Sequence, residues 1–443
     1  MAGPGLRIVS IAEQLAAVAD VTLAVGIEGS DTGALAERGF AVIEYRDRDA
    51  LVALVEGTDI VFCQLIDEYV VRKGLVAGCR FIFDLYNALP AEAIGAERIG
   101  GFDTQPQMND VFTNVLGFFR FCMRAGSYFV TSNERQRDFW IGYMLASEGL
   151  LPSELNGRHA GEVIGLVPFG MEDSEPMARR HGIRGNFGID DEALVLLWAG
   201  GIWDWFDAET PIRAIADLCE SGIEAHLVFY GTTHPNGLVG RPTAVQRARD
   251  LAVELGVLDD RVHFVEGWVP ASERAEYLLD ADIAISGHKE SFETRYAFRT
   301  RILDHFWATL PSIVSEGDWF AEYIAQQELG AVTPYGDVAA TRAAIVELAD
   351  AARRERISAN VSSIRDDWRW VTTTRQLRAV VSDWQHALPS RTQAITEART
   401  ALTPQIAAEP APAPIDDRSR LRRAASASVL GALYRRLKRL ARR

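Results

Sequence analysis

The stretch ADIAISGHKESFETRYAFRTRILDHFWATLPSIVSE, residues 281–316, contains a complete strand–loop–helix–strand pattern. Its apolar beginning, ADIAIS, predicts a buried strand, and RTRILDHFWATLP after the loop predicts a helix. A second strand, PSIVSE, follows directly. Two apolar strands joined by a helix are typical of a parallel sheet that helices cover on both faces. We therefore predict an α/β fold.

Strands and helices alternate in the same way along most of the chain. A polar, glycine-containing segment at 172–192 separates two series of strands. Because 443 residues exceed the size of one ordinary core, we predict two doubly wound, Rossmann-like domains, at 1–180 and 190–360. The strand candidates are 21–25, 41–45, 59–65, 80–86, 127–132 and 165–170 in the first domain, and 194–201, 226–231, 262–268, 281–287 and 311–316 in the second.

The remaining C-terminal part falls into three segments. Residues 361–388 have helical character, and we expect them to pack back across the domains. The Ala- and Pro-rich residues 389–417 predict a flexible linker. Residues 418–443 contain ten Lys and Arg residues and no acidic residue. Leucines there recur at spacings of three and four, which predicts either a helix on an anionic membrane surface or a disordered basic tail; they are Leu430, Leu433, Leu437 and Leu440.

The composition, 48% hydrophobic and 24% charged, is that of an ordinary globular protein. No apolar run is long enough to cross a membrane, and the N-terminus lacks the pattern of a secretory signal. A net charge of −15 argues against non-specific binding of nucleic acid. The four cysteines have no paired or metal-like spacing, which fits a cytoplasmic protein with reduced thiols.

Glycines lie at the ends of three of the predicted strands in the second domain. They are Gly200 with Gly201, Gly231, and Gly267, which precedes Trp268. Ligands of doubly wound sheets bind beyond the carboxyl ends of the strands, and glycine lets a ligand approach the backbone closely. Trp268 could stack on a base. Tight turns, and domain packing by Trp268, would produce the same pattern.

The loop and helix start after residue 288 concentrate positive charge. Lys289, Arg295, Arg299 and Arg301 lie there, and Asp304 follows one turn into the helix. Arginine binds phosphate oxygens in bidentate fashion, and a carboxylate can accept hydrogen bonds from a ribose diol. A solvated basic loop is the alternative. Together with the glycines at neighbouring strand ends, the charges favour a site for a nucleoside diphosphate.

The second half resembles the nucleotide-binding domain of GT-B-fold glycosyltransferases of the family-4 type. That family has a Glu-x7-Glu motif before an apolar helix that ends in Leu-Pro, and FRTRILDHFWATLPSIVSEGD (298–318) fits this frame. Asp304 matches the second glutamate. Tyr296 stands at the first, so Glu293 is the nearest acid for the sugar contact. GGIWDWFD lacks the family's phosphate-binding cation, and Arg299 and Arg301 are expected to replace it.

The resemblance extends over roughly residues 3–388. The stretches GGIWDWFDAET, GTTHPN, EGWVP and ETRYAFRTRILD together resemble a subgroup met in bacterial polysaccharide clusters. In the first half, FDLYNALP (83–90) occupies the place of the family's His-Asp pair facing the donor sugar. Asp84 matches the aspartate, and Phe83 stands where the histidine would be.

The resemblance implies a retaining glycosyltransferase with two domains facing a cleft. It would move a sugar from a nucleotide-diphosphate sugar to a hydroxyl of a glycan or lipid-linked acceptor, in cell-surface polysaccharide synthesis at the inner face of the cell membrane. The leaving phosphate would take the acceptor's proton, and no metal or other cofactor is expected. The implied catalytic residues are Asp84, Glu293, Arg299 and Arg301, and the implied donor-binding residues are Gly200, Gly201, Gly231, Trp268, Lys289, Tyr296, Thr300 and Asp304.

Two other functional classes use the same architecture. A nucleotide-sugar epimerase or phosphorylase would consume the donor without a glycan acceptor. A non-catalytic, membrane-bound relative would explain why Tyr296 stands in place of an acid.

The start of the chain departs from the family, whose first domain opens with a strand, a glycine-rich loop and a helix. Gly3 and Gly5 match the loop, and LRIVSIAEQLAAVAD (6–20) predicts the helix. We therefore expect either that the first strand has been lost or that the true start lies upstream of Met1. The alternative is that LRIVSI is itself the first strand.

Overall fold

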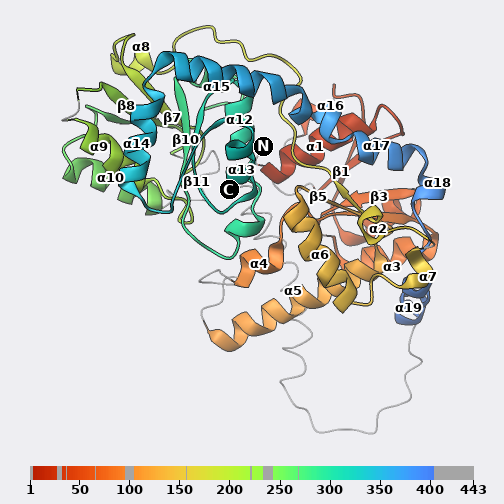
Figure 1. The fold of residues 1–443 in the computed structure, drawn as a ribbon. Coiled ribbons are helices and arrows are strands. Elements are labelled where there is room, and N and C mark those ends of the chain that lie inside the picture. The colour runs from red at the N-terminus through yellow and green to blue at the C-terminus, as the bar shows by residue number, and fades with distance from the viewer. Residues whose placement is uncertain are drawn as a thin grey trace. The chain divides into compact units, whose positions relative to one another are not determined.

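The computed structural model describes residues 3–26, 32–35, 37–64, 66–94, 104–155, 157–219, 222–232, 243–267 and 269–403. They form two compact units (Figure 1). Of the described residues, unit 1 contains those up to Pro168 and those from Thr374 to Thr403, and unit 2 contains Phe169–Thr373. The first unit therefore ends earlier than the predicted boundary at residue 180, and residues 374–388 belong to unit 1.

Unit 2 is built on a six-stranded parallel sheet with the order β12-β11-β10-β7-β8-β9. Every residue of the central strand β7 is buried, as expected where both faces of a sheet are covered. The five strands predicted in this half are all present, and β12 was not predicted. The strands are β7 (Leu194–Trp198), β8 (Ala225–Phe229), β9 (Val262–Phe264), β10 (Ile283–Ser286), β11 (Ser312–Ser315) and β12 (Gly330–Thr333).

The connections of this sheet run outward in two directions. Helices α9 (Glu209–Leu218) and α10 (Thr243–Glu254) connect β7, β8 and β9, whereas α12 (Arg301–Trp307) and α13 (Trp319–Gln326) connect β10, β11 and β12. Because such connections are right-handed, the two pairs of helices cover opposite faces. The strand order reverses between β7 and β10, and ligands bind at such a switch point.

Further helices complete unit 2. Helices α14 (Val338–Leu348) and α15 (Ala351–Ile364) begin directly after Asp337 and Asp350, whose carboxylates accept hydrogen bonds from N–H groups of the first turn. The remaining elements are α8 (Arg184–Phe187), α11 (Arg274–Leu278), η4 (Thr294–Tyr296), η5 (Arg365–Trp368) and α16 (Trp370–Thr373).

Unit 1 contains two parallel sheets. Strands β3 (Ile60–Cys63), β4 (Arg80–Asp84), β5 (Tyr128–Thr131) and β6 (Ile164–Leu166) pair in chain order. Strands β1 (Thr22–Gly26) and β2 (Ala41–Tyr45) pair only with each other among the described residues. The helices of the first 168 residues, with two short 3-10 turns, are α1 (Gly3–Leu15), η1 (Gly33–Leu35), α2 (Arg48–Glu56), α3 (Glu68–Ala77), α4 (Leu89–Ile94), α5 (Gln105–Ala125), α6 (Glu134–Ala146), α7 (Pro152–Leu155) and η2 (Ala160–Glu162).

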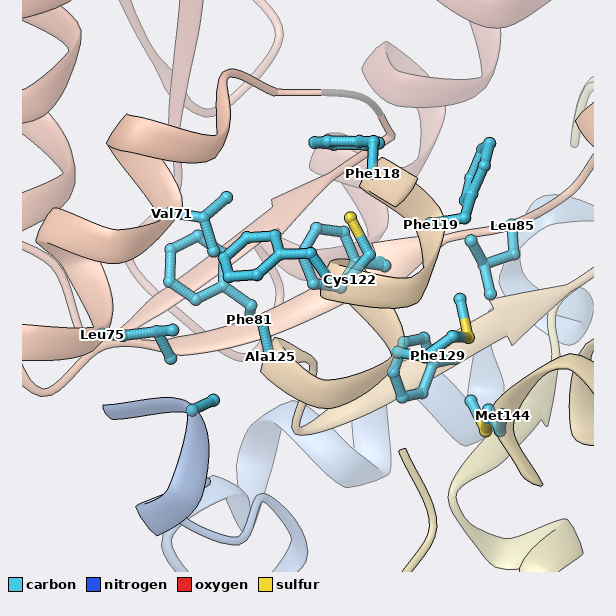
Figure 2. Packing of buried hydrophobic residues seen from close by; sticks show 14 of the residues in the cluster. Val71, Leu75, Phe81, Leu85, Phe118, Phe119, Cys122, Ala125, Phe129 and Met144 are labelled. Atoms are coloured by element: carbon cyan, nitrogen blue, oxygen red, sulfur yellow. The ribbon is translucent and has the colours of Figure 1, made fainter. Parts of the chain in front are cut away.

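The main core of unit 1 lies between the four-stranded sheet and its helices. Figure 2 shows Phe81 and Phe129, from β4 and β5, packed with Cys122 and Ala125 of α5. Phe81 and Phe83 stack with their ring centroids 5.9 Å apart. The long apolar stripe of α5 explains this arrangement, because its apolar residues recur at helical spacing and face the sheet.

The first described residues form helix α1, as predicted, and not the strand that was the alternative for LRIVSI. Gly3 and Gly5 lie in the first turns of this helix, so the predicted glycine loop is wrong. Val9 and Ala12 of α1 pack with Leu35 and Phe40 over the β1–β2 sheet. The spacing of the apolar residues in α1 favours a helix over a strand, because it places them on one side of the helix.

The segment after unit 2 returns to unit 1 through α17 (Arg375–Ser382), α18 (Trp384–Ala387) and α19 (Thr392–Leu402). Helix α19 corrects the prediction of a flexible linker over 389–417, because Ala394 and Ala398 are buried in the core of unit 1. Residues 404–417 and the basic tail 418–443 lie outside the described residues. Within the described part of the chain, no helix is both long and apolar enough to span a bilayer.

Candidate functional site

Three glycines meet at the carboxyl ends of β7 and β8. Gly200 and Gly231 have φ angles of +116° and +76°, which side-chain-bearing residues rarely adopt. A Cβ atom on Gly231 would lie 2.9 Å from the carbonyl carbon of Gly200 and 3.0 Å from the nitrogen of Gly201. The structure therefore brings the predicted residues Gly200, Gly201 and Gly231 together, and the close approach requires glycine.

Arg301, at the start of α12, lies against the same turn. Its Nη2 donates a 2.8 Å hydrogen bond to the carbonyl of Gly201. Its guanidinium carbon lies 3.9 Å from the ring centre of Phe206 and 5.1 Å from that of Trp198. Burial, and then the charge of Arg299, lowers the pKa of Arg301 to about 9, so the group keeps its proton at pH 7.

Arg299 has a different environment. Its Nη2 donates a 2.9 Å hydrogen bond to Glu293, and its Nε lies 3.9 Å from Asp318, which also caps helix α13. By contrast, no described carboxylate lies within 4.0 Å of the Arg301 guanidinium. The charge of Arg299 is therefore compensated within the protein, whereas that of Arg301 is held by a carbonyl and by ring faces.

The loops after β7 and β10 are joined at the switch point. The N–H of Asp207 donates to the carbonyl of Gly287 (3.0 Å), and the N–H of Lys289 donates to the carbonyl of Trp205 (3.1 Å). A Cβ atom at Gly287 would lie 2.6 Å from the carbonyl oxygen of Asp207, so this contact also depends on glycine. The two loops are thereby held together by a pair of backbone hydrogen bonds.

The loop before α12 is anchored by an aromatic cluster. Phe298, next to Arg299, lies 4.6 Å from Phe320 of α13, measured between ring centres. Trp368 packs on Phe320 at 5.4 Å and on Phe306 of α12 at 6.0 Å. Rigid packing on this side limits the positions that the two neighbouring arginines can take.

Asp304 lies one turn into α12, as predicted, and it has a partner that the sequence did not suggest. The Nε of Arg274 is 3.4 Å from the Asp304 carboxylate, and the Nη2 of Arg274 donates to Glu172 (2.9 Å). Arg274 also lies over the ring of Trp307, 4.6 Å from its centre. Burial raises the pKa of Asp304, and the charge of Arg274 opposes this shift.

The other predicted donor-binding residues are more peripheral. Lys289 and Thr300 are exposed, and Tyr296 is half-buried with its ring centre 5.5 Å from that of Phe292. Glu293, proposed as the acid for the sugar contact, is the partner of Arg299. Trp268 lies outside the described residues.

Asp84, predicted to face the donor sugar, is buried inside unit 1. It forms a bidentate ion pair with Arg7, both bonds being 2.8 Å long, and both side chains are completely removed from water. Gln64 donates a further 3.2 Å bond to Asp84. The predicted catalytic role is therefore corrected, because the carboxylate is occupied by an internal partner and does not reach the surface.

Comparison with known proteins agrees with the geometry of unit 2. Residues 193–351 match the family described as glycosyl transferases group 1. This part of the chain is therefore similar to that glycosyltransferase family. The match covers the six strands and the glycine and arginine residues around the switch point, and it confirms the resemblance to GT-B glycosyltransferases of the family-4 type.

Solved structures of the same fold extend over both units. HepE of Anabaena in complex with UDP is 13% identical, covers 86% of this chain and 96% of its own, and gives a TM-score of 0.62. Sucrose-phosphate synthase of Thermosynechococcus elongatus is 15% identical over 87% of this chain and 94% of its own, with a TM-score of 0.58. The glycosyltransferase WaaG is 17% identical over 86% and 96%, with a TM-score of 0.55. The chain thus has the GT-B fold with two Rossmann-like domains. Among curated proteins, no sequence matches.

Proposed function

We propose that this protein is a retaining glycosyltransferase that transfers a sugar from a nucleoside-diphosphate sugar to a hydroxyl of a glycan or lipid-linked acceptor in cell-surface polysaccharide synthesis. The observation that carries the proposal is Arg301, a cation at the switch point of the unit 2 sheet that lies within 4.0 Å of no described carboxylate. A partly buried cation of this kind is stabilised by an anion. Its guanidinium adjoins the glycine turn, where a diphosphate can approach the backbone.

Charge on the leaving diphosphate is the central chemical problem of the proposed reaction. As the bond between the sugar and the phosphate breaks, negative charge accumulates on the phosphate oxygens. Arg301 is held in place by Gly201 and by aromatic faces before the donor binds, so it would stabilise this charge without reorganising. The phosphate oxygen that leaves can take the proton of the acceptor hydroxyl. The proposal therefore needs neither a protein base nor a metal ion.

The names of proteins with the same fold guide the choice of ligands. HepE has been solved with UDP and with UDP-glucose, and WaaG is described as involved in lipopolysaccharide biosynthesis. These descriptions support a uridine nucleotide as the first probe for this chain and a cell-surface glycan as its product class.

The basic tail, residues 418–443, is proposed to hold the enzyme at the inner face of the cell membrane. Its ten Lys and Arg residues and its leucine stripe favour a helix on anionic lipid. Deletion of 418–443 should release the protein from vesicles that contain phosphatidylglycerol while donor binding stays intact. Equal co-sedimentation of both proteins would reject the membrane role.

Transfer itself is tested with a panel of UDP-, GDP-, ADP- and TDP-sugars. Thermal unfolding identifies the donor, and mass spectrometry then follows its consumption with and without a membrane extract as acceptor. We expect stabilisation by one nucleotide, and sugar release that depends on the acceptor. Consumption without acceptor would indicate an epimerase or phosphorylase, and binding without any consumption would indicate a non-catalytic relative. Absence of binding to every nucleotide would reject the proposed function.

A further inference from the structure

We propose that Trp203 and Trp205 form a stacking platform for the pyranose ring of the donor, an inference that rests on the proposed function. Both residues lie in the loop after β7, between the glycine turn and α9. Their rings are stacked, with centres 5.8 Å apart and planes 18° from parallel. Trp205 is 47% exposed, although tryptophan is among the costliest side chains to leave in water.

The platform adjoins the proposed phosphate contact. A Cβ atom at Gly201 would lie 3.0 Å from Nε1 of Trp203, so the indole ring lies against the backbone of Gly201. The carbonyl of the same residue accepts the hydrogen bond of Arg301. In a nucleoside-diphosphate sugar, the pyranose is bonded directly to the second phosphate. A phosphate at Arg301 would therefore place the sugar within reach of Trp203.

The loop that carries the two rings is held rigidly. Phe206 pairs with His288 as an isolated β-bridge, and the carbonyl of Trp205 accepts the N–H of Lys289. On the other side, the carboxylate of Asp204 accepts hydrogen bonds from Thr243 (2.8 Å) and Arg247 (3.0 Å). A platform that is ordered before binding costs little conformational entropy when a ligand arrives.

The chemistry of the two indoles suits a sugar better than a protein partner. The C–H face of a pyranose packs on an aromatic face, and its hydroxyls need hydrogen-bond donors and acceptors at the edge. In the described residues, neither indole N–H donates to a protein group, and the exposed Lys289 follows the adjoining strand. The patch thus combines apolar faces with polar groups at its rim.

Binding of UDP and UDP-glucose, measured by isothermal titration of the full chain, tests the platform. If UDP-glucose does not bind the parent protein, the sugar nucleotide found by the donor panel and its free diphosphate replace this pair. Trp205→Ala should lower the affinity for the sugar nucleotide by roughly three- to tenfold, the range expected for one aromatic contact, and leave the affinity for the diphosphate unchanged. Trp205→Phe should restore most of the loss. Val253→Ala is the matched control, because this exposed apolar residue lies at the far end of α10 and should change neither affinity.

Every other outcome contradicts either the proposed platform or the proposed function on which it rests. Equal weakening of diphosphate and sugar nucleotide would mean that Trp205 only supports the loop, and unchanged affinities for both would show that no sugar contacts it. A rise in the KM of the acceptor alone, with donor affinity intact, would move the ring to the acceptor and reject the donor assignment. If the parent binds no nucleotide, the proposed function fails and the platform fails with it.

Discussion

Arg7 in unit 1 and Arg301 in unit 2 each lie beside the carboxyl ends of parallel strands, but their surroundings differ. Arg7 meets the carboxylate of Asp84 with two bonds of 2.8 Å, and no part of either side chain contacts water. Arg301 meets a backbone carbonyl and two aromatic rings. The first arginine is satisfied by the fold itself, whereas the second keeps a charge that a ligand can use. Position at a strand end is therefore insufficient to assign a function.

The largest effect that tests this comparison is expected in unit 1. Asp84→Asn leaves the charge of Arg7 buried without its counter-charge, which should cost about 3–5 kcal/mol of stability. Asp138→Asn, at an exposed position of α6, is the matched control and should cost about 0.5 kcal/mol or less. Urea unfolding followed by pulsed hydrogen exchange of unit 1 peptides measures both. A stable Asp84→Asn protein that has lost only transferase activity would restore the catalytic role.

The next effect separates the two neighbouring arginines of unit 2. Arg301→Met should weaken the binding of a nucleoside diphosphate by about 1.5–3 kcal/mol, or tenfold or more, with little loss of stability. Arg299→Met should mainly lower the melting temperature, because it leaves Glu293 and Asp318 facing each other without a cation. Titration calorimetry and thermal unfolding of both variants give the two quantities. The reverse pattern would show that Arg299 is the phosphate ligand.

Most of the fold follows from patterns that are local in the sequence. The strands of unit 2 are short apolar runs, and the apolar residues of α5 (Gln105–Ala125) recur at helical spacing. Helix α19 was missed because its buried residues are two small alanines in a segment that looks like the start of a linker. The strand β12 (Gly330–Thr333) is only four residues long and begins with glycine, so it carried no strand signal.

The site was harder to predict because the roles of its charged side chains depend on partners that lie far away in the sequence. Arg299, Arg301 and Asp304 were found from their spacing in one stretch. Arg274 is 30 positions from Asp304, and Arg7 is 77 from Asp84, so nothing local pairs them. The prediction for Asp84 failed for this reason. A carboxylate after a strand looks the same in sequence whether it meets a ligand or an internal arginine.

Acidification should destabilise unit 2 through histidines that are buried without charge. Burial lowers the pKa of His288 and of His305 to about 3. These histidines bind protons near pH 6.5 in the unfolded chain but only near pH 3 in the folded one. Their contribution to stability is therefore complete above pH 6.5 and is lost as the pH falls towards 3. Each histidine should contribute a slope of about 1.4 kcal/mol per pH unit in this window. Urea unfolding between pH 7.5 and 5 measures the slope.

The variant His305→Asn checks the origin of that slope. It should reduce the pH dependence of the unit 2 transition by the contribution of one histidine, whatever it does to stability at pH 7.5. His386→Asn, at an exposed position of unit 1, is the control and should leave the unit 2 slope unchanged. An unaltered slope in His305→Asn would show that other groups cause the acid sensitivity.

The smallest effect concerns Asp304. Asp304→Asn keeps the shape of the side chain but weakens its acceptor, so nucleoside-diphosphate affinity should fall by about 0.5–1.5 kcal/mol. Inorganic pyrophosphate, which has no ribose, should bind the variant as it binds the parent. Competition of UDP and pyrophosphate against a fluorescent nucleotide compares the two. Equal losses would place Asp304 near the phosphates instead of the ribose.

A crystal structure of the protein with UDP, or with the diphosphate that the donor panel identifies, tests the central claim most directly. The account predicts phosphate oxygens within hydrogen-bond distance of the Arg301 guanidinium, beside Gly200 and Gly201 at the ends of β7 and β10. Arg299 would keep its contacts with Glu293 and Asp318. A diphosphate bound elsewhere, or one that draws Arg299 away from these carboxylates while Arg301 makes no contact, would contradict the account.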